Sequence, residues 1–294
     1  MRLVTYRTSR QGPWQAGIEQ DGRVVAASTV YNYGNQPPTV RALLEAGSAE
    51  LEQALAGARR VFDAGEKTVI ALDSLELGPP IPDPDKIICL GLNYADHAAE
   101  SNMAIPKAPV LFAKYRNSLV GPRDDIVLPG NSEQIDYEAE LAVVIGKTCK
   151  KVSEAEALSY VAGYTILNDV SARDLQFLTG QWLTGKAIDT FAPTGPGIVP
   201  ASEIPDPQDL MLSTRVNGQL LQHASTKLMI FSVAKTIEFI SSIMTLVPGD
   251  IISTGTPAGV GQSRKPPLFL REGDVVEVEI ERIGTIVNKV VGPV

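Results

Sequence analysis

The stretch Ile135-Asp-Tyr-Glu-Ala-Glu-Leu-Ala-Val-Val-Ile145 decides the fold, because its pattern predicts a β-strand with two different faces. Successive side chains on a strand point to opposite faces. One face is apolar throughout and carries Ile135, Tyr137, Ala139, Leu141, Val143 and Ile145. The other face carries Asp136, Glu138 and Glu140 and then continues with the apolar Ala142 and Val144. Since neither face is polar along its whole length, the stretch predicts a core strand that brings carboxylates into the interior.

A further carboxylate ends a second apolar strand, in Tyr164-Thr-Ile-Leu-Asn-Asp169. Neighbouring carboxylates on one strand face lie about 7 Å apart and repel each other, more strongly when they are buried. One explanation of the acidic pattern is a solvated strand face. The other is a hard divalent cation bound by carboxylates of the two strands, either Mg²⁺ or Mn²⁺, with Ca²⁺ as an alternative occupant in a crystal.

The rest of the chain predicts an α+β protein that is mainly β. Strands are expected at 86–90, 143–145, 160–167 and 275–280 and from Ile286 onward, and helices at 94–101, 153–157, 171–178 and 232–245. Residues 213–221 contain the hairpin signal Asn217-Gly218. Strands and helices do not alternate regularly, which argues against Rossmann and TIM-barrel folds.

The sequence also predicts two domains. Residues 1–77 are expected to form a small α+β domain, with a hairpin turn at Asp21-Gly22 and helices at 39–46 and 49–56. The segment Gly78-Pro-Pro-Ile-Pro-Asp-Pro-Asp85 has four prolines in eight residues, which can neither continue a helix nor pair in a central strand. We interpret residues 78–85 as a stiff connector to a second domain at residues 86–294.

Three residues could move a proton or stabilise a negative charge that develops on the substrate. His97 and Glu100 lie three residues apart on one face of a predicted helix, where the carboxylate could orient the imidazole as a general base. A surface ion pair on a short helix is the alternative. Lys186, in Thr184-Gly-Lys-Ala-Ile-Asp189, could stabilise an oxyanion near a metal, or it could be a solvated surface lysine.

Other polar residues could bind a substrate carboxylate. Arg173 and Gln176 share one face of the predicted helix after Asp169, and ordinary helix-surface polarity is the alternative. The segment from Gly249 to Gly261 is a strand followed by a glycine-rich turn, without the GxGxxG or Walker A pattern of a nucleotide loop. Its backbone amides and the hydroxyls of Thr254 and Thr256 could bind an oxyanion, or the glycines could only shape a turn.

The composition disfavours several classes of protein. The 294 residues carry 26 Lys and Arg against 34 Asp and Glu, and this net charge of -8 disfavours a nucleic-acid binder. Two cysteines and two histidines are too few for a disulfide scaffold or for a zinc site built on several histidines. No apolar run approaches the roughly 20 residues of a membrane-spanning helix, so no membrane partner is expected. The first residues lack the apolar core of a signal peptide, and we expect a reduced, cytoplasmic protein.

Taken together, these motifs resemble those of the fumarylacetoacetate hydrolase (FAH) family. The resemblance rests on an ordered set of motifs: Gly91-Leu-Asn-Tyr-Ala-Asp-His-Ala-Ala-Glu100, Tyr137-Glu-Ala-Glu-Leu-Ala-Val-Val-Ile-Gly146, Asn168-Asp-Val-Ser-Ala-Arg-Asp174, Gly185-Lys186, Phe191-Ala-Pro-Thr-Gly-Pro196, Val216-Asn-Gly218 and Thr254-Gly-Thr-Pro-Ala-Gly-Val-Gly261. Each motif is weak alone, but the ordered set over residues 86–294 is specific. Within the family, residues 264–274 and 284–289 are most similar to oxaloacetate-tautomerising mitochondrial members and to bacterial relatives that act on oxaloacetate.

The resemblance implies a fold and a set of site residues. The expected fold is a mixed, sandwich-like β-roll catalytic domain, usually in a homodimer. The implied site consists of Mg²⁺ or Mn²⁺ held by Glu138, Glu140 and Asp169, a water-activating dyad of His97 and Glu100, a catalytic Lys186, and substrate contacts from Arg173, Gln176 and Thr256.

The resemblance also implies a small 2-oxo or 2,4-dioxo acid as substrate, which reacts through a metal-stabilised enolate. We expect C–C bond hydrolysis of an acylpyruvate or a fumarylacetoacetate-like substrate. The alternatives are keto–enol tautomerisation or decarboxylation of oxaloacetate, and isomerisation of a 2-hydroxyhepta-2,4-diene-1,7-dioate-type substrate. A non-enzymatic scaffold is the alternative from another class of function, and the intact ligand and dyad positions argue against it.

Overall fold

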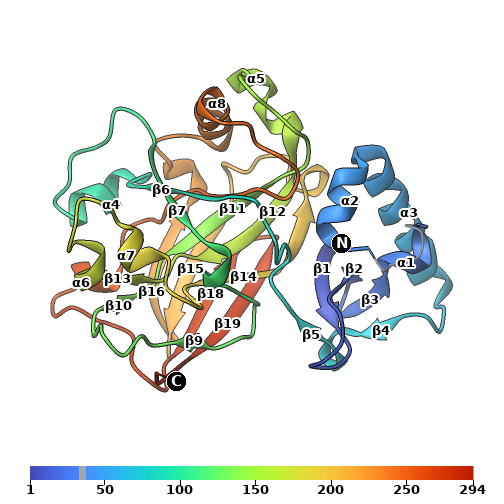
Figure 1. Ribbon diagram of the computed structural model, residues 1–294, viewed down its shortest axis with the longest axis horizontal. Helices are drawn as coiled ribbons and strands as arrows, with labels where there is room; N and C mark the ends of the chain where they lie inside the picture. The colour runs from blue at the N-terminus through green and yellow to red at the C-terminus, as the bar shows by residue number, and fades with distance from the viewer. Residues whose placement is uncertain (33–37, 294) are drawn as a thin grey trace.

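The computed structural model describes residues 1–32 and 38–293, which form two main β-sheets with helices at their edges (Figure 1). The strands are β1 (Arg2–Arg7), β2 (Gln15–Gln20), β3 (Arg23–Ala26), β4 (Ile70–Ala71), β5 (Glu76–Leu77), β6 (Ile87–Gly91), β7 (Val110–Lys114), β8 (Leu119–Val120), β9 (Ile126–Val127), β10 (Ile135–Asp136), β11 (Ala139–Ile145), β12 (Val161–Asn168), β13 (Ser171–Ala172), β14 (Ala192–Pro200), β15 (Met211–Val216), β16 (Gln219–Ser225), β17 (Ile251–Ser253), β18 (Val275–Ile280) and β19 (Gly284–Val291). The helices are α1 (Ala27–Val30), α2 (Val40–Ala46), α3 (Ser48–Ala64), α4 (Ala95–Glu100), α5 (Glu154–Ala157), α6 (Arg173–Gln176), α7 (Leu183–Lys186) and α8 (Val233–Ile243).

The two sheets differ in size and in the part of the chain that builds them. Among the described residues, the larger sheet has 12 strands in the order β4-β3-β2-β1-β14-β12-β11-β17-β6-β7, with β5 beside β1 and β8 beside β14. The smaller sheet has five strands in the order β16-β15-β18-β19-β9. Strands β10 and β13 form a separate pair. The predicted α+β, mainly β class is therefore confirmed.

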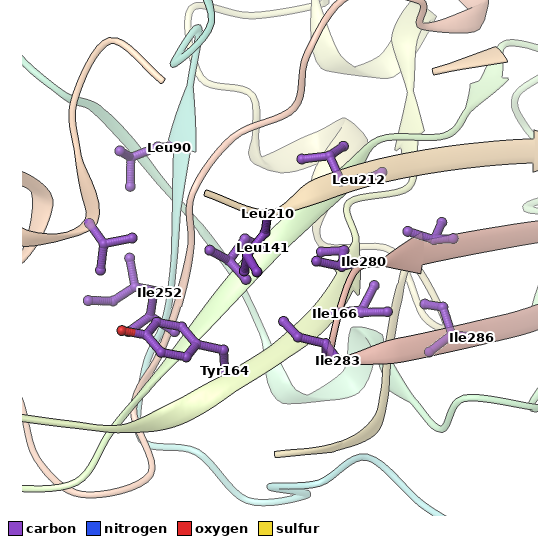
Figure 2. Close-up of a cluster of buried hydrophobic side chains, with 14 of the residues drawn as sticks. Leu90, Leu141, Tyr164, Ile166, Leu210, Leu212, Ile252, Ile280, Ile283 and Ile286 are labelled. Carbon is purple, nitrogen blue, oxygen red and sulfur yellow. The ribbon is translucent and has the colours of Figure 1, made fainter. Parts of the chain in front are cut away.

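The main hydrophobic core lies between the two sheets. Figure 2 shows Leu141 and Ile166 of the larger sheet and Leu212 and Ile280 of the smaller sheet turned toward one another. All six apolar residues of the predicted strand face at 135–145 belong to this core. Ala142 and Val144, on the opposite face, belong to a second core that also contains residues of α2 and α3. Strand β11 is thus buried on both faces, as its sequence predicts.

Local sequence signals account for most turns and helix ends. Asp21 and Gly22 join β2 to β3 with φ values of 52° and 74°, and Asn217 and Gly218 join β15 to β16 with φ values of 52° and 79°. Two successive positive φ values are typical of the type I′ hairpin turn. Thr39 caps α2, because its hydroxyl oxygen accepts the N–H of Ala42.

Three predicted elements differ from the structure. The helix expected at 49–56 runs on to Ala64, because Ala58, Val61 and Phe62 continue its buried face. The helix expected at 171–178 is reduced to α6, because Ser171–Ala172 pairs with β10 instead. The strand expected over 135–145 is interrupted between β10 and β11. At this break the N–H of Glu138 donates to the side chain of Asn168 rather than to a neighbouring strand.

The N-terminal segment is joined to the rest of the chain by sheet pairing and by the second core. Strand β1 pairs with β14 at Leu3 and Ile198, and both residues belong to that core. Residues 78–85 contain no helix or strand, and Thr5 Oγ1 donates to the Pro80 carbonyl at 2.7 Å. The division into domains at 1–77 and 86–294 stays a prediction. In the described part of the chain, no helix is long and apolar enough to span a bilayer.

Candidate active site

A cavity of about 300 Å³ brings together residues that are far apart in the sequence. Seven of the nine predicted site residues line it, namely His97, Glu138, Glu140, Arg173, Gln176, Lys186 and Thr256. The other two contact a lining residue: Glu100 hydrogen-bonds to His97, and Asp169 hydrogen-bonds to Lys186. The cavity therefore collects the predicted carboxylates, the predicted dyad and the predicted substrate contacts at one place.

The three predicted metal ligands converge at the ends of two antiparallel strands. Glu138 directly precedes β11, Glu140 lies on β11, and Asp169 directly follows β12. The pairing of Ala139 with Asn168 brings the two segments together, and the N–H of Asp169 donates to the Glu138 carbonyl at 2.9 Å. One oxygen from each carboxylate lies within 4.8 Å of the others, and all three residues are buried. The solvated-face explanation of these acids is therefore wrong.

Three buried cations surround two of these carboxylates. Lys186 Nζ lies 2.6 Å from Glu138 Oε2 and 2.7 Å from Asp169 Oδ2. Lys114 Nζ lies 2.6 Å from Asp169 Oδ1, and Arg173 Nη2 lies 2.7 Å from Glu138 Oε1. Burial by itself would raise the pKa of Glu138, but the charges of Arg173 and Lys186 outweigh it and hold that pKa below its usual value. Glu138 is therefore a carboxylate kept ionised in the interior.

Glu140 has a different environment. Its carboxylate accepts the hydroxyl of Ser253 and the N–H of Gly255, and within the described residues no cationic side chain pairs with it. Burial, together with repulsion from Asp169 and Glu138, raises the pKa of Glu140 well above its usual value.

The buried charges of this cluster do not balance. Four buried carboxylates, those of Asp136, Glu138, Glu140 and Asp169, face the three cations Lys114, Arg173 and Lys186. An all-oxygen donor set with excess negative charge fits a hard divalent cation. The residues present therefore suit Mg²⁺ or Mn²⁺, and they do not distinguish between the two.

The glycine-rich turn binds carboxylates of the protein itself. The N–H groups of Gly255, Gly259 and Gly261 donate to Glu140, Glu100 and Asp136 at 2.9, 2.9 and 2.6 Å. Gly259 has a φ of 108°, and a Cβ atom there would lie 2.3 Å from the Leu221 carbonyl oxygen. These amides therefore hold site residues in place, and their binding of a ligand oxyanion stays a prediction.

The two threonines of this turn have different roles. Thr254 donates its hydroxyl to the Leu141 carbonyl at 2.8 Å, so its predicted use as an oxyanion ligand is not supported. Thr256 lines the cavity, and its hydroxyl oxygen accepts from the side-chain amide of Gln222 at 2.8 Å.

His97 and Glu100 form the predicted dyad on α4. His97 Nδ1 lies 2.9 Å from Glu100 Oε1, and the other oxygen of Glu100 accepts the N–H of Gly259. The imidazole is buried rather than exposed, which argues against an ordinary surface ion pair. Because an ionised Glu100 accepts from Nδ1, the basic nitrogen of a neutral His97 is Nε2.

Arg173 and Gln176 line the cavity, but their hydrogen bonds stay within the protein. Arg173 donates to Asp136, to Glu138 and to Gln176. Burial by itself would lower the pKa of Arg173, but Glu138 and Asp136 raise it above its usual value. Arg173 therefore fixes a predicted metal ligand, and its contact with substrate stays a prediction.

Sequence reasoning missed several residues of the site. Lys114, the last residue of β7, neutralises Asp169, and Asp136 is the second acceptor of Arg173. Phe112 and Trp182 form an edge-to-face pair with ring centres 5.5 Å apart on the cavity wall. The alternation at 135–145 did put Asp136 on the same face as Glu138. No local signal distinguishes Lys114 from a surface lysine.

The match to a family profile shows to which protein family the chain belongs. The profile described as "Fumarylacetoacetate (FAA) hydrolase C-terminal" covers residues 86–291. The chain belongs to the fumarylacetoacetate hydrolase family. It is thus an FAH-family enzyme, and the fold expected from the resemblance is confirmed.

Members of the FAH family are similar to the chain over almost its whole length. The rat protein named "Oxaloacetate tautomerase Fahd2a, mitochondrial" is 45% identical over 294 residues, which are 99% of this chain and 92% of the relative. The structure of fumarylacetoacetate hydrolase from Exiguobacterium antarcticum matches with a TM-score of 0.81 and 37% identity, covering 99% of both chains. That of 2-hydroxyhepta-2,4-diene-1,7-dioate isomerase from Mycobacterium marinum matches with a TM-score of 0.75 and 37% identity, covering 99% of this chain and 98% of the other.

Proposed function

We propose that this FAH-family enzyme is a divalent-metal-dependent keto–enol tautomerase of oxaloacetate. The observation that carries the proposal is the 45% identity, over 99% of the chain, to a protein named as an oxaloacetate tautomerase. The proposal takes up the alternative stated above in place of C–C bond hydrolysis, because the relative named as a tautomerase shares more of the sequence, 45%, than the structure named as a fumarylacetoacetate hydrolase, 37%.

Glu138, Glu140 and Asp169 are the residues that would hold Mg²⁺ or Mn²⁺. A bound ion would supply Lewis-acid polarisation of the 2-oxo group of the substrate. The buried carboxylate of Glu140 supports this assignment, because no cationic side chain in residues 1–32 and 38–293 pairs with it.

Lys186 is suited to stabilise negative charge on the substrate. Burial would lower the pKa of Lys186, but Asp169 and Glu138 outweigh this effect and raise it. Lys186 is therefore an ammonium group at neutral pH. It lines the cavity, where a fixed positive charge lowers the free energy of an oxyanion that develops at the 2-oxo position.

His97 is suited to move the proton. In the direction from enol to keto, the enol oxygen loses one proton and C3 gains one, so one group that accepts and returns a proton is sufficient. His97 Nε2 is the basic nitrogen left free by the contact with Glu100. The apolar wall of Phe112, Trp182 and Val260 limits access of water to the same cavity.

C–C bond hydrolysis remains the second candidate, and the dyad is the observation that favours it. The 2.9 Å contact between His97 and Glu100 is the arrangement needed to activate a water molecule. Decarboxylation and the isomerase reaction are further alternatives that share the same polarised 2-oxo group.

The test is a pair of assays run in parallel with and without Mg²⁺. One follows the absorbance of enol-oxaloacetate, and the other follows pyruvate release from acetylpyruvate. We expect rapid Mg²⁺-dependent loss of the enol without pyruvate release, and His97→Ala should slow it by about 100-fold or more. The matched control is His223→Ala, because His223 is exposed on β16. Pyruvate release from acetylpyruvate that depends on His97 would instead establish the hydrolase.

We further propose a homodimer, formed through the β7 edge of the larger sheet. In the described part of the chain, β7 pairs with β6 only, and an exposed strand edge is a ready site for pairing with another chain. Light scattering should then give about twice the chain mass of 31.5 kDa. A cytoplasmic location also stays a prediction, whereas the rat relative is named mitochondrial, and cell fractionation separates the two.

A further inference from the structure

Gln222 is a buried amide next to the cavity-lining Thr256, and neither the sequence analysis nor the proposed mechanism assigns it a role. It lies on β16, in the smaller sheet, and is 1% exposed. Its oxygen accepts the N–H of Ala139 at 3.0 Å and the hydroxyl of Thr214 at 2.7 Å. Its nitrogen donates to Thr256 Oγ1 at 2.8 Å and to the Pro257 carbonyl at 2.9 Å. All four hydrogen-bonding positions of the amide are therefore filled by protein groups.

Two of these partners fix the orientation of the amide. A backbone N–H can only donate, so the group that faces Ala139 must be the side-chain oxygen. A backbone carbonyl can only accept, so the group that faces Pro257 must be the nitrogen. Rotating the amide by 180° would place two donors against each other at Ala139 and two acceptors at Pro257, each at the cost of a buried unsatisfied pair.

The orientation of the Gln222 amide determines which hydrogen bonds the Thr256 hydroxyl accepts and donates. Because the Gln222 nitrogen donates to Thr256 Oγ1, that oxygen is the acceptor and its own proton remains to be donated. Over residues 1–32 and 38–293, no protein group accepts this proton. Thr256 lines the same cavity as Glu138 and Glu140. Its hydroxyl is therefore set to donate to a ligand.

We propose that Gln222 is a positioning residue that makes Thr256 a hydrogen-bond donor to the carboxylate of the 2-oxo acid bound in the cavity. The inference rests on the proposed function, since it takes a 2-oxo acid as the ligand. The same amide accepts from Ala139, which lies between the proposed ligands Glu138 and Glu140. Gln222 therefore sets the substrate-binding hydroxyl in register with the strand that would hold the metal.

The experiment is a double-mutant cycle on binding rather than on turnover. Pyruvate, the simplest 2-oxo acid, is titrated into the Mg²⁺-loaded protein by calorimetry, with the KM and kcat of oxaloacetate tautomerisation as a second readout. Thr256→Val should weaken pyruvate binding by about 10- to 100-fold, the usual effect of a lost hydrogen bond to a charged group, and Thr256→Ser should restore it. Gln222→Met should raise the dissociation constant in the wild-type background. On the Thr256→Val background it should change that constant by less than about twofold.

Thr214→Val is the matched control, because it removes a hydrogen bond from the same amide without touching Thr256. It should leave pyruvate affinity and KM near the wild-type values. Equal losses in Thr214→Val and Gln222→Met would overturn the proposal, as would independent, multiplicative effects of Gln222→Met and Thr256→Val. If Gln222→Met does not fold, the proposal still fails when Thr256→Val binds pyruvate as the wild type does. Wild-type protein that binds pyruvate but does not tautomerise oxaloacetate contradicts the proposed function and leaves this inference standing.

Discussion

The two sides of the carboxylate cluster have opposite electrostatic environments, although Glu138 and Glu140 lie two residues apart. On the basic side, Glu138 and Asp169 are paired with Lys114, Arg173 and Lys186. On the loop side, Glu140 accepts from the hydroxyl of Ser253 and the N–H of Gly255, and no cationic side chain of the described residues pairs with it. The basic side is therefore stabilised within the folded chain, whereas ionisation of Glu140 is not offset by a neighbouring cation. The first arrangement fixes the geometry of the site, and the second suits the site to a cation.

The largest loss of activity should follow removal of a carboxylate from either side of the cluster. We expect Glu138→Ala and Glu140→Ala each to lower Mg²⁺-dependent turnover by more than about 100-fold, since even outer-shell partners of a metal ligand are worth 10- to 100-fold. Asp209→Ala is the control, because this exposed acid pairs with the exposed Lys227 and does not line the cavity. Full activity of Glu138→Ala after treatment with a chelator would contradict the metal assignment.

Replacing each acid by a neutral amide should change the free energy of unfolding differently on the two sides. Glu138→Gln removes one charged partner from Arg173 and one from Lys186, which keep Asp136 and Asp169, respectively. Breaking a buried ion pair from one side costs about 3–5 kcal/mol, and the remaining partners reduce that cost. We therefore expect the free energy of unfolding of the metal-free protein, measured in urea, to fall by up to about that amount. An unchanged midpoint and slope would mean that the basic side does not stabilise the fold.

Glu140→Gln should raise the free energy of unfolding, in contrast to Glu138→Gln. In the metal-free protein it removes a buried charge that is repelled by Asp169 and Glu138, while its oxygen can still accept from Ser253 and Gly255. We expect a gain of about 1 kcal/mol, seen as a melting temperature about 2–4 °C higher. The stabilisation that Mg²⁺ gives to the wild type should be absent in this variant. A loss of stability like that of Glu138→Gln would remove the distinction between the two sides.

The smallest effect should be a pH dependence that only the loop side produces. The pKa of Glu140 is higher in the folded than in the unfolded state, so the folded state binds this proton more tightly. The contribution of Glu140 to stability is therefore greatest at low pH and declines as pH rises from about 4.3 through the raised pKa. We expect the advantage of metal-free Glu140→Gln over the wild type to be larger at pH 8 than at pH 5. A constant difference across this range would contradict the raised pKa.

The sequence predicted what depends on local pattern and short-range register. The alternation at 135–145 identified the six core residues, and the ends of the two strands pointed to Glu138 and Asp169 before any contact was known. The turns at Asp21-Gly22 and Asn217-Gly218 followed from backbone conformations that few residues adopt.

The sequence did not predict what depends on distant partners. Lys114 pairs with Asp169, 55 residues away, and the Gln222 amide donates to Thr256, 34 residues away. Nothing near Lys114 or Gln222 in the chain marks these side chains as buried. The break between β10 and β11 arises because Asn168, 30 residues on, takes the N–H of Glu138. A pattern of alternating faces fixes which way a side chain points, but not which groups the fold brings to meet it.

A titration with Mn²⁺ tests whether Glu138, Glu140 and Asp169 form a cation site. Electron paramagnetic resonance counts free Mn²⁺ in the presence of wild-type protein, of Glu140→Gln and of the His223→Ala control. We expect the wild type and the control each to bind one Mn²⁺ tightly per chain, and excess Mg²⁺ to displace it. We expect Glu140→Gln to bind no Mn²⁺. Equal binding by wild type and Glu140→Gln, or no binding by the wild type, would contradict the cation site.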